Sequence, residues 1–261
     1  MLSDNPIIVG KQSLPPRILL YGQEKIGKST FASNAPNPIF VATEDGQNEI
    51  GCARFPLATS YTAVLANIGW LIEHKHDYQT LALDSADWTE RLIHADVCSK
   101  DNADSIELAA GGYGKGYGIA LKHWAEVLAA LNYARDERGM QIIIIAHAQV
   151  ERFEDPESPA YDRWSPKLHK KSSAPLLMEW ADVVAFATRR ARTETKKTNG
   201  RERTTAAPIG KSGGERILRC TGSPACVAGN RYGLPDELPL DYAAFAAAMN
   251  SPETPTETKG N

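Results

Sequence analysis

The stretch RILLYGQEKIGKST, residues 17–30, constrains this chain more than any other part of its sequence. An apolar run ends at Gly22, four residues follow, and Gly27, Lys28 and Ser29 complete the pattern G-x-x-x-x-G-K-[ST]. Where that pattern follows a strand and opens a helix, backbone N–H groups and the helix N-terminus surround a phosphate. The stretch therefore predicts a phosphate-binding P-loop.

The P-loop pattern also predicts which residues contact a nucleotide and its metal ion. Lys28 is expected to reach β- and γ-phosphate oxygens, and the Ser29 hydroxyl is expected to ligate Mg²⁺. The predicted nucleotide-binding residues are Gly22, Gln23, Glu24, Lys25, Ile26, Gly27, Lys28, Ser29 and Thr30.

Apolar runs alternate with segments of helical spacing along the rest of the chain. The uniformly apolar run QIIIIA (141–146) is typical of a strand buried on both faces of a sheet. The alternation predicts an α/β fold, with a mostly parallel central sheet and helices on both faces. Expected strands are 17–22, 39–43, 80–84, 141–146, the segment ending near 190 and 216–220; expected helices are 28–34, about 60–75, 86–97, the segment from about 118 to 139 and 240–249.

Composition and charge limit the class of protein. Hydrophobic residues make up 42% and charged residues 23% of the 261 residues, as in ordinary globular proteins. The sequence has no apolar run near the about 20 residues of a membrane span, no secretory leader pattern and no C-x-x-C pair, which favours a cytoplasmic protein with reduced thiols. Its net charge of −3 restricts any nucleic-acid contact to a local surface.

The chain is expected to form one main domain. Residues 15–250 are predicted to be that domain, after a flexible arm (1–14) and before a disordered tail (251–261). The dipeptide Asn199-Gly200 predicts the turn of a β-hairpin in the C-terminal part.

Acidic residues follow two of the expected strands. Asp84 ends TLALD, and its carboxylate is the expected second Mg²⁺ ligand, acting through water. Glu44 and Asp45 follow the strand 39–43, and Glu44 is the candidate base for an attacking water, with Asp45 as the alternative. In a parallel sheet these carboxylates share the carboxyl edge, where ligands bind.

Two further segments carry candidate catalytic groups. His147 and Gln149 end the apolar run 141–146, where either side chain could sense a γ-phosphate. Arg231 lies in GNRYG and is a candidate arginine finger for a neighbouring subunit's site, with a plain surface arginine in a turn as the alternative.

These segments, in this order, resemble the RecA-like ATPases, and more narrowly the compact phage recombination ATPases of the Sak group. The resemblance rests on LLYGQEKIGKST, IFVATEDG, TLALDS, GGYGKGYG, IIIIAHAQ, EWADVVAF and GNRYGLPDEL, which together span about 17–240. It implies ATP with Mg²⁺ as cofactors, water activation by Glu44, and coupling of His147 or Gln149 to a DNA-binding loop.

The resemblance further implies single-stranded DNA as a partner. The corresponding loop is 150–175, and GGYGKGYG (111–118) is a second candidate. Cations beside aromatic rings suit a single strand, because charges neutralise phosphates and rings stack on bases. The candidate contacts are Arg152, Tyr161, Arg163, Trp164, Lys167, Lys170 and Lys171, with Tyr113, Lys115 and Tyr117 in the second segment.

The expected function is DNA-stimulated ATP hydrolysis in phage recombination or single-strand annealing, in the host cytoplasm. The resemblance implies a homo-oligomer, ring or filament, and adds a single-strand DNA-binding protein as a candidate partner. Gly229 departs from the family pattern, which often has a lysine near the finger arginine. A ring-type helicase motor, a small-molecule phosphotransferase and an ATP-binding scaffold remain alternatives.

Overall fold

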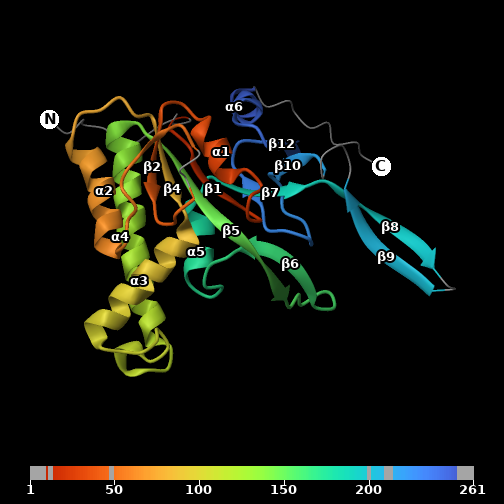
Figure 1. Ribbon diagram of the computed structural model, residues 1–261, viewed down its shortest axis with the longest axis horizontal. Coiled ribbons are helices and arrows are strands. Elements are labelled where there is room, and N and C mark those ends of the chain that lie inside the picture. Colours follow the sequence, from red (N-terminus) through yellow and green to blue (C-terminus); the bar gives the residue numbers. More distant parts are fainter. Residues whose placement is uncertain (1–9, 11–13, 47–49, 199–200, 209–213, 252–261) are drawn as a thin grey trace.

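A ten-stranded sheet forms the centre of the molecule, and helices cover both of its faces (Figure 1). The computed structural model describes residues 10, 14–46, 50–198, 201–208 and 214–251. The helices and strands have the following bounds. Strands are β1 (Arg17–Gly22), β2 (Pro38–Ala42), β3 (Ala53–Arg54), β4 (Thr80–Asp84), β5 (Gln141–Phe153), β6 (Tyr161–Pro166), β7 (Val183–Arg189), β8 (Ala191–Thr198), β9 (Arg201–Pro208), β10 (Arg216–Arg219), β11 (Gly229–Asn230) and β12 (Glu237–Pro239). Helices are α1 (Lys28–Ser33), α2 (Tyr61–Glu73), α3 (Ala86–Asp101), the short 3₁₀ helix η1 (Ala109–Gly111), α4 (Lys115–Arg138), α5 (Ser173–Trp180) and α6 (Tyr242–Asn250).

The strand order explains where a ligand site can form. The sheet runs β12-β10-β7-β1-β5-β4-β2-β3, and the six strands from β7 to β3 are parallel. Strands β10 and β12 add an antiparallel edge. The carboxyl ends of β1, β2, β4 and β5 therefore meet at one edge of the sheet, directly after the motifs described above.

Alternating residues of the parallel strands supply two separate cores. In β1, Leu19 and Tyr21 pack with α2, α3, α4 and α5 on one face, whereas Ile18 and Leu20 pack with α1 and α6 on the other. The run 142–145 of β5 is fully buried, because both faces of this central strand are covered. The predicted α/β fold, with helices on both faces, is confirmed.

The sequence predicts a loop over residues 150–175, but the first part of this segment is a β-hairpin. β5 continues to Phe153 and pairs antiparallel with β6, so that residues 148–166 form a β-hairpin, labelled β5 and β6 in Figure 1. Its strands lack an apolar period, because ladder hydrogen bonds and polar cross-strand pairs hold them together. One such pair joins Arg163 to Glu151 at 2.9 Å.

Three predicted segments, the N-terminal arm, the hairpin turn and the C-terminal tail, lie partly or wholly outside the described residues. β8 and β9 form the antiparallel ribbon that extends from the sheet in Figure 1, as expected for the C-terminal part, while the turn residues Asn199 and Gly200 lie outside the described residues. The predicted arm and tail lie outside them too, apart from Gly10, Leu14 and Ser251. Within the described ranges, no helix is long and apolar enough to cross a membrane.

Candidate active site

The P-loop leaves the carboxyl end of β1 and enters α1. A close contact requires glycine at its first position, and the backbone conformation favours glycine at position 27. A Cβ on Gly22 would lie 2.4 Å from the carbonyl oxygen of Ala187 in β7. Gly27 has φ +112°, a left-handed value that favours glycine. The loop conformation thus depends on these two positions of the predicted motif.

Lys28 lies under this loop with its ammonium group buried. Its Nζ donates hydrogen bonds to the carbonyl oxygens of Gly22 (2.9 Å) and Gln23 (2.8 Å), and the residue is 6% exposed. Burial lowers the pKa of Lys28, and the charge of Asp84 opposes that shift. A lysine has three N–H donors, so one remains for an anionic ligand such as a terminal phosphate.

Ser29 and Asp84, the two predicted metal ligands, are in direct contact. The Ser29 hydroxyl donates to Asp84 Oδ2 at 2.7 Å, at the end of the buried strand β4. Mg²⁺ prefers oxygen ligands and is usually held by one or two protein groups plus substrate phosphates and water. This hydroxyl–carboxylate pair, at the N-terminus of α1 beside the P-loop, fits a nucleotide–Mg²⁺ complex.

Glu44 and His147 face each other across the same edge. Glu44 follows β2, and its Oε1 lies 4.0 Å from Nε2 of His147 in β5. Burial raises the pKa of Glu44, and the nearby Asp84 carboxylate adds to the effect. Asp45, the alternative base, lines with Glu44 a small cavity of about 120 Å³.

Asp87 is a site residue that the sequence analysis missed. It lies in the first turn of α3, 4% exposed, and its carboxylate accepts from His147 three times: from the backbone N–H (3.0 Å) and, at both oxygens, from Nδ1 (3.0 and 3.1 Å). The hydrogen bond that Asp87 accepts from Nδ1 raises the pKa of His147 despite burial. An acidic residue in a first helical turn is ordinarily explained by the helix dipole, so the sequence alone gave no signal for this contact.

Arg216 is a second residue that sequence reasoning did not find. It begins β10, and its Nη1 donates to the carbonyl oxygen of Ile26 within the P-loop at 3.3 Å. The antiparallel pairing of β10 with β7 brings this guanidinium beside a loop 190 residues earlier in the chain. It adds a positive charge at the candidate anion site.

Gln149, the alternative to His147, points to the hairpin instead. Its Nε2 donates to the carbonyl oxygens of Pro166 (3.2 Å) and Leu168 (3.1 Å), where the chain leaves β6. His147 thus faces the P-loop edge while Gln149, two residues on, holds the return of the hairpin. The structure gives the two candidates different contacts.

The candidate DNA-contacting residues divide into two groups. Arg163 pairs with Glu151 and stacks over Phe153 at 3.8 Å, and Tyr161 packs against the same ring, so both hold the hairpin together. Trp164 stacks on Phe186 of β7 and joins the hairpin to the sheet. Exposed side chains form the other group. These are Arg152, Lys167, Lys170 and Lys171.

The segment 111–118 is only partly a loop. α4 begins at Lys115, earlier than expected, and Tyr117 stacks on His169 with ring centroids 3.9 Å apart. Tyr113, in contrast, is 98% exposed. The second candidate segment therefore lies against the residues that follow the hairpin, joined to them through one aromatic stack.

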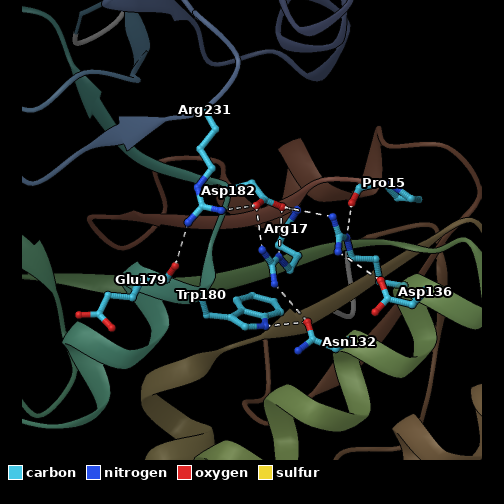
Figure 2. Close-up of polar contacts among 9 residues, drawn as sticks. Pro15, Arg17, Asn132, Asp136, Glu179, Trp180, Asp182 and Arg231 are labelled. Atoms are coloured by element: carbon cyan, nitrogen blue, oxygen red, sulfur yellow. Dashed lines mark hydrogen bonds and ion pairs between the residues drawn. The ribbon is translucent and has the colours of Figure 1, made fainter. Parts of the chain in front are cut away.

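Arg231 lies at the opposite edge of the sheet from the P-loop. It approaches Asp182, the residue before β7, with Nη1 at 3.5 Å from Oδ1, and Nη2 donates to the Glu179 carbonyl at 3.4 Å (Figure 2). Asp182 is already bound by Arg17 at 2.9 Å, with Arg135 at 3.8 Å. Arg231 is not brought to the site of its own chain.

Comparisons with known proteins bear on this arrangement. The curated protein "SPbeta prophage-derived uncharacterized protein YorG" of Bacillus subtilis (strain 168) is 24% identical over 184 residues, which cover 69% of this chain and 53% of the relative. The chain thus spans about half the length of that relative. The crystal structure of the RadB recombinase aligns at 13% identity with a TM-score of 0.43, covering 79% of this chain and 81% of that one.

A family comparison covers more of the chain. The model of the AAA domain family matches residues 14–232, which include the P-loop, both strand-end carboxylates, His147 and Arg231. The match spans most of the sequence and includes all the residues of the candidate nucleotide site, so that the P-loop, Asp84 and Glu44 all lie within it. The chain therefore belongs to the AAA domain family of P-loop ATPases.

Proposed function

We propose that this protein hydrolyses ATP in a RecA-like manner, binds single-stranded DNA, and promotes phage DNA recombination or single-strand annealing. The observation that carries the proposal is the continuity of β5. The strand passes His147 at the P-loop edge and continues directly into the hairpin beside the exposed cations. One rigid element thus joins the candidate hydrolysis site to the candidate DNA surface.

At the nucleotide end, each group has a distinct role. Lys28 and the P-loop backbone bind the phosphates, and Ser29 and Asp84 hold Mg²⁺, which when bound neutralises charge on the phosphates. Glu44 orients and deprotonates the attacking water. Glu44 is preferred to Asp45 because its carboxylate faces His147 across the site.

At the DNA end, exposed cations meet the sugar–phosphate backbone and rings stack on bases. Lys167, Lys170 and Lys171 follow β6 as a short exposed basic run, and Tyr113 is the most exposed aromatic side chain in the second candidate segment. Phosphate contacts of this kind weaken as salt rises, because bound counterions are released on binding.

Arg231 acts in trans in this proposal, within a homo-oligomeric ring or filament. Its own P-loop lies at the other edge of the sheet, so only a neighbouring subunit's nucleotide is within its reach. Mixing inactive Lys28→Ala subunits with Arg231→Ala subunits tests this: hydrolysis should reappear in the mixture, because each mixed interface can join an intact P-loop to an intact arginine. Mixtures that stay inactive at every ratio would contradict the role in trans.

The cellular setting is also part of the proposal. A prophage-derived relative supports a phage protein that acts in the host cytoplasm, where a single-strand DNA-binding protein is a candidate partner.

The first test measures ATP hydrolysis with and without a single-stranded oligonucleotide. We expect stimulation by the oligonucleotide, lost in both Lys28→Ala and Glu44→Gln. The double variant Lys170→Ala/Lys171→Ala should lose stimulation while retaining basal hydrolysis. Its matched control, Lys75→Ala/Lys122→Ala, removes two exposed lysines from other parts of the surface. Hydrolysis indifferent to DNA, with no oligonucleotide bound at low salt in the presence of ATP, would contradict the proposal and favour a small-molecule phosphotransferase.

A further inference from the structure

We infer that Asp87 is a positioning residue for ATP hydrolysis, which fixes the imidazole of His147 so that its Nε2 faces Glu44. The inference rests on the proposed ATPase function. It assigns a role to a buried carboxylate that accepts hydrogen bonds from His147.

The contacts of Asp87 fix both the place and the rotation of the ring. Its Oδ1 accepts from the backbone N–H of His147, which joins the start of α3 to β5. Both oxygens lie within 3.1 Å of Nδ1, so that nitrogen carries the proton that the carboxylate accepts. With Nδ1 occupied, Nε2 is the ring atom left to act, and it lies 4.0 Å from Glu44 Oε1.

The surroundings of His147 explain why such a partner is needed. Charged groups face the imidazole from three elements: Asp87 from α3, Glu44 from beyond β2, and Lys28 from α1. Lys28 repels a protonated ring, whereas the two carboxylates attract it. Without Asp87 the ring would lose its fixed tautomer and be free to turn, and Nε2 would no longer be held opposite Glu44. Catalytic hydrogen bonds are often long before substrate binds, so a 4.0 Å separation is compatible with contact in the reacting complex.

A second Asp–His pair, whose aspartate also lies in α3, supplies a matched control. Asp96, in α3, lies 2.9 Å from His123 Nε2 and also contacts Lys100. This pair joins α3 to α4, on the face of the sheet opposite α1 and α6, and neither residue belongs to the proposed site. Asp87→Asn and Asp96→Asn therefore make the same chemical change to the same kind of pair, at and away from the site.

The kinetic test compares these variants in the full chain. We expect Asp87→Asn to lower kcat about 10- to 100-fold, the range found for groups that orient metal-ligating histidines, with KM for ATP changed little. Asp96→Asn should retain wild-type kcat. In a His147→Gln background, Asp87→Asn should lower kcat no further, because it acts through the ring that is already missing. An unchanged kcat in Asp87→Asn, or an undiminished loss in the double variant, would overturn the inference.

A spectroscopic readout separates this inference from the proposed function. ¹⁵N NMR of the imidazoles should show His147 protonated at Nδ1 in the wild type and a downward shift of its titration in Asp87→Asn, with no change in Asp96→Asn. This holds whether or not the protein hydrolyses ATP. A wild type that hydrolyses nothing would refute the ATPase function, whereas a His147 resonance that does not respond to Asp87→Asn would refute the positioning role.

Discussion

The two edges of the parallel sheet both bury carboxylates beside cations, but their charge balance is opposite. At the amino edge three arginines, Arg17, Arg135 and Arg231, lie around Asp182, and Arg135 also pairs with Asp136 at 3.2 Å (Figure 2). At the carboxyl edge the ratio is reversed. There the carboxylates of Glu44, Asp84 and Asp87 lie around Lys28 and His147, and Arg216 adds one more cation at the P-loop.

This difference distinguishes a structural cluster from a ligand site. Asp182 has several cationic partners, and its hydrogen bonds with Arg17 join the start of β1 to the start of β7. Among the contacts that the structure describes, the carboxyl edge has three carboxylates and only two permanently charged cations, Lys28 and Arg216, a balance that a bound divalent cation would complete. The first edge is expected to determine stability, and the second to determine activity.

Replacing Lys28 should have the largest effect on the carboxyl edge. Lys28→Ala removes the buried ammonium from under the P-loop, and we expect hydrolysis to fall to the background rate. The variant should remain folded, because Lys28 hydrogen-bonds only loop carbonyls in the described structure. Hydrolysis and circular dichroism measured together check both statements. A variant that still hydrolyses ATP would exclude Lys28 from the site.

Replacing Glu44 should have the next largest effect. Glu44→Gln should lower kcat about 10²- to 10⁴-fold, the usual contribution of a general base, and leave nucleotide binding intact. Its Tm at neutral pH should rise, because the pKa of Glu44 is raised by burial and by Asp84, so its ionised form costs stability above that pKa. Asp45→Asn is the matched control and should retain activity; the reverse result would make Asp45 the base.

The sequence predicted those parts of the site that follow local patterns. Lys28, Ser29, Asp84 and Glu44 each come directly after an apolar strand or within a spaced motif, and a parallel sheet brings such positions together. Asp87 and Arg216 were missed because their roles depend on partners 60 and 190 residues away, which no local pattern encodes.

Local patterns also predict most of the fold, and the prediction is wrong where a segment is held together by strand pairing. The buried strands and α2, α3, α4 and α6 carry apolar periods, whereas the β5–β6 hairpin is held by backbone pairing and by polar cross-strand contacts such as Arg163 with Glu151. A solvent-facing hairpin of that kind has the composition of a loop. Its polar residues therefore predict a loop when the sequence is considered alone.

At the amino edge, the expected effect is on stability. Asp182→Asn should lower the free energy of unfolding by about 2–3 kcal/mol, because it weakens charged hydrogen bonds to Arg17 and leaves buried guanidinium charge uncompensated. Denaturant unfolding at pH 7 measures this loss. Hydrolysis per folded molecule should change little in the basal assay. A variant as stable as the wild type would contradict the structural role of this cluster.

Acid should act on the two edges with opposite signs. Burial alone would raise the pKa of Asp182, but hydrogen bonds from Arg17 outweigh it and hold the pKa below its usual value. The stability that Asp182 contributes is therefore present above the unfolded value of about 3.9 and lost as pH falls through the folded pKa. Glu44, with its raised pKa, contributes in the other direction. Thermal unfolding from pH 6 to pH 3 should show a flatter acid decline in Asp182→Asn than in the wild type; parallel curves would contradict this linkage.

The smallest effect on stability is expected for Arg231. Its replacement tests whether this arginine belongs to the structural cluster at the amino edge. Its side chain is 64% exposed and reaches an Asp182 carboxylate that Arg17 already binds at shorter range. Exposed pairs contribute little, so Arg231→Ala should change the free energy of unfolding by no more than about 0.5 kcal/mol. Arg17→Ala is the matched control on the same carboxylate and should cost several times more. An Arg231→Ala variant as unstable as Arg17→Ala would make Arg231 a member of the structural cluster, and its availability to a neighbouring subunit would lose its physical basis. A near-neutral change would instead mean that the fold does not need this arginine, which leaves its side chain free to leave Asp182 at little cost and to act elsewhere.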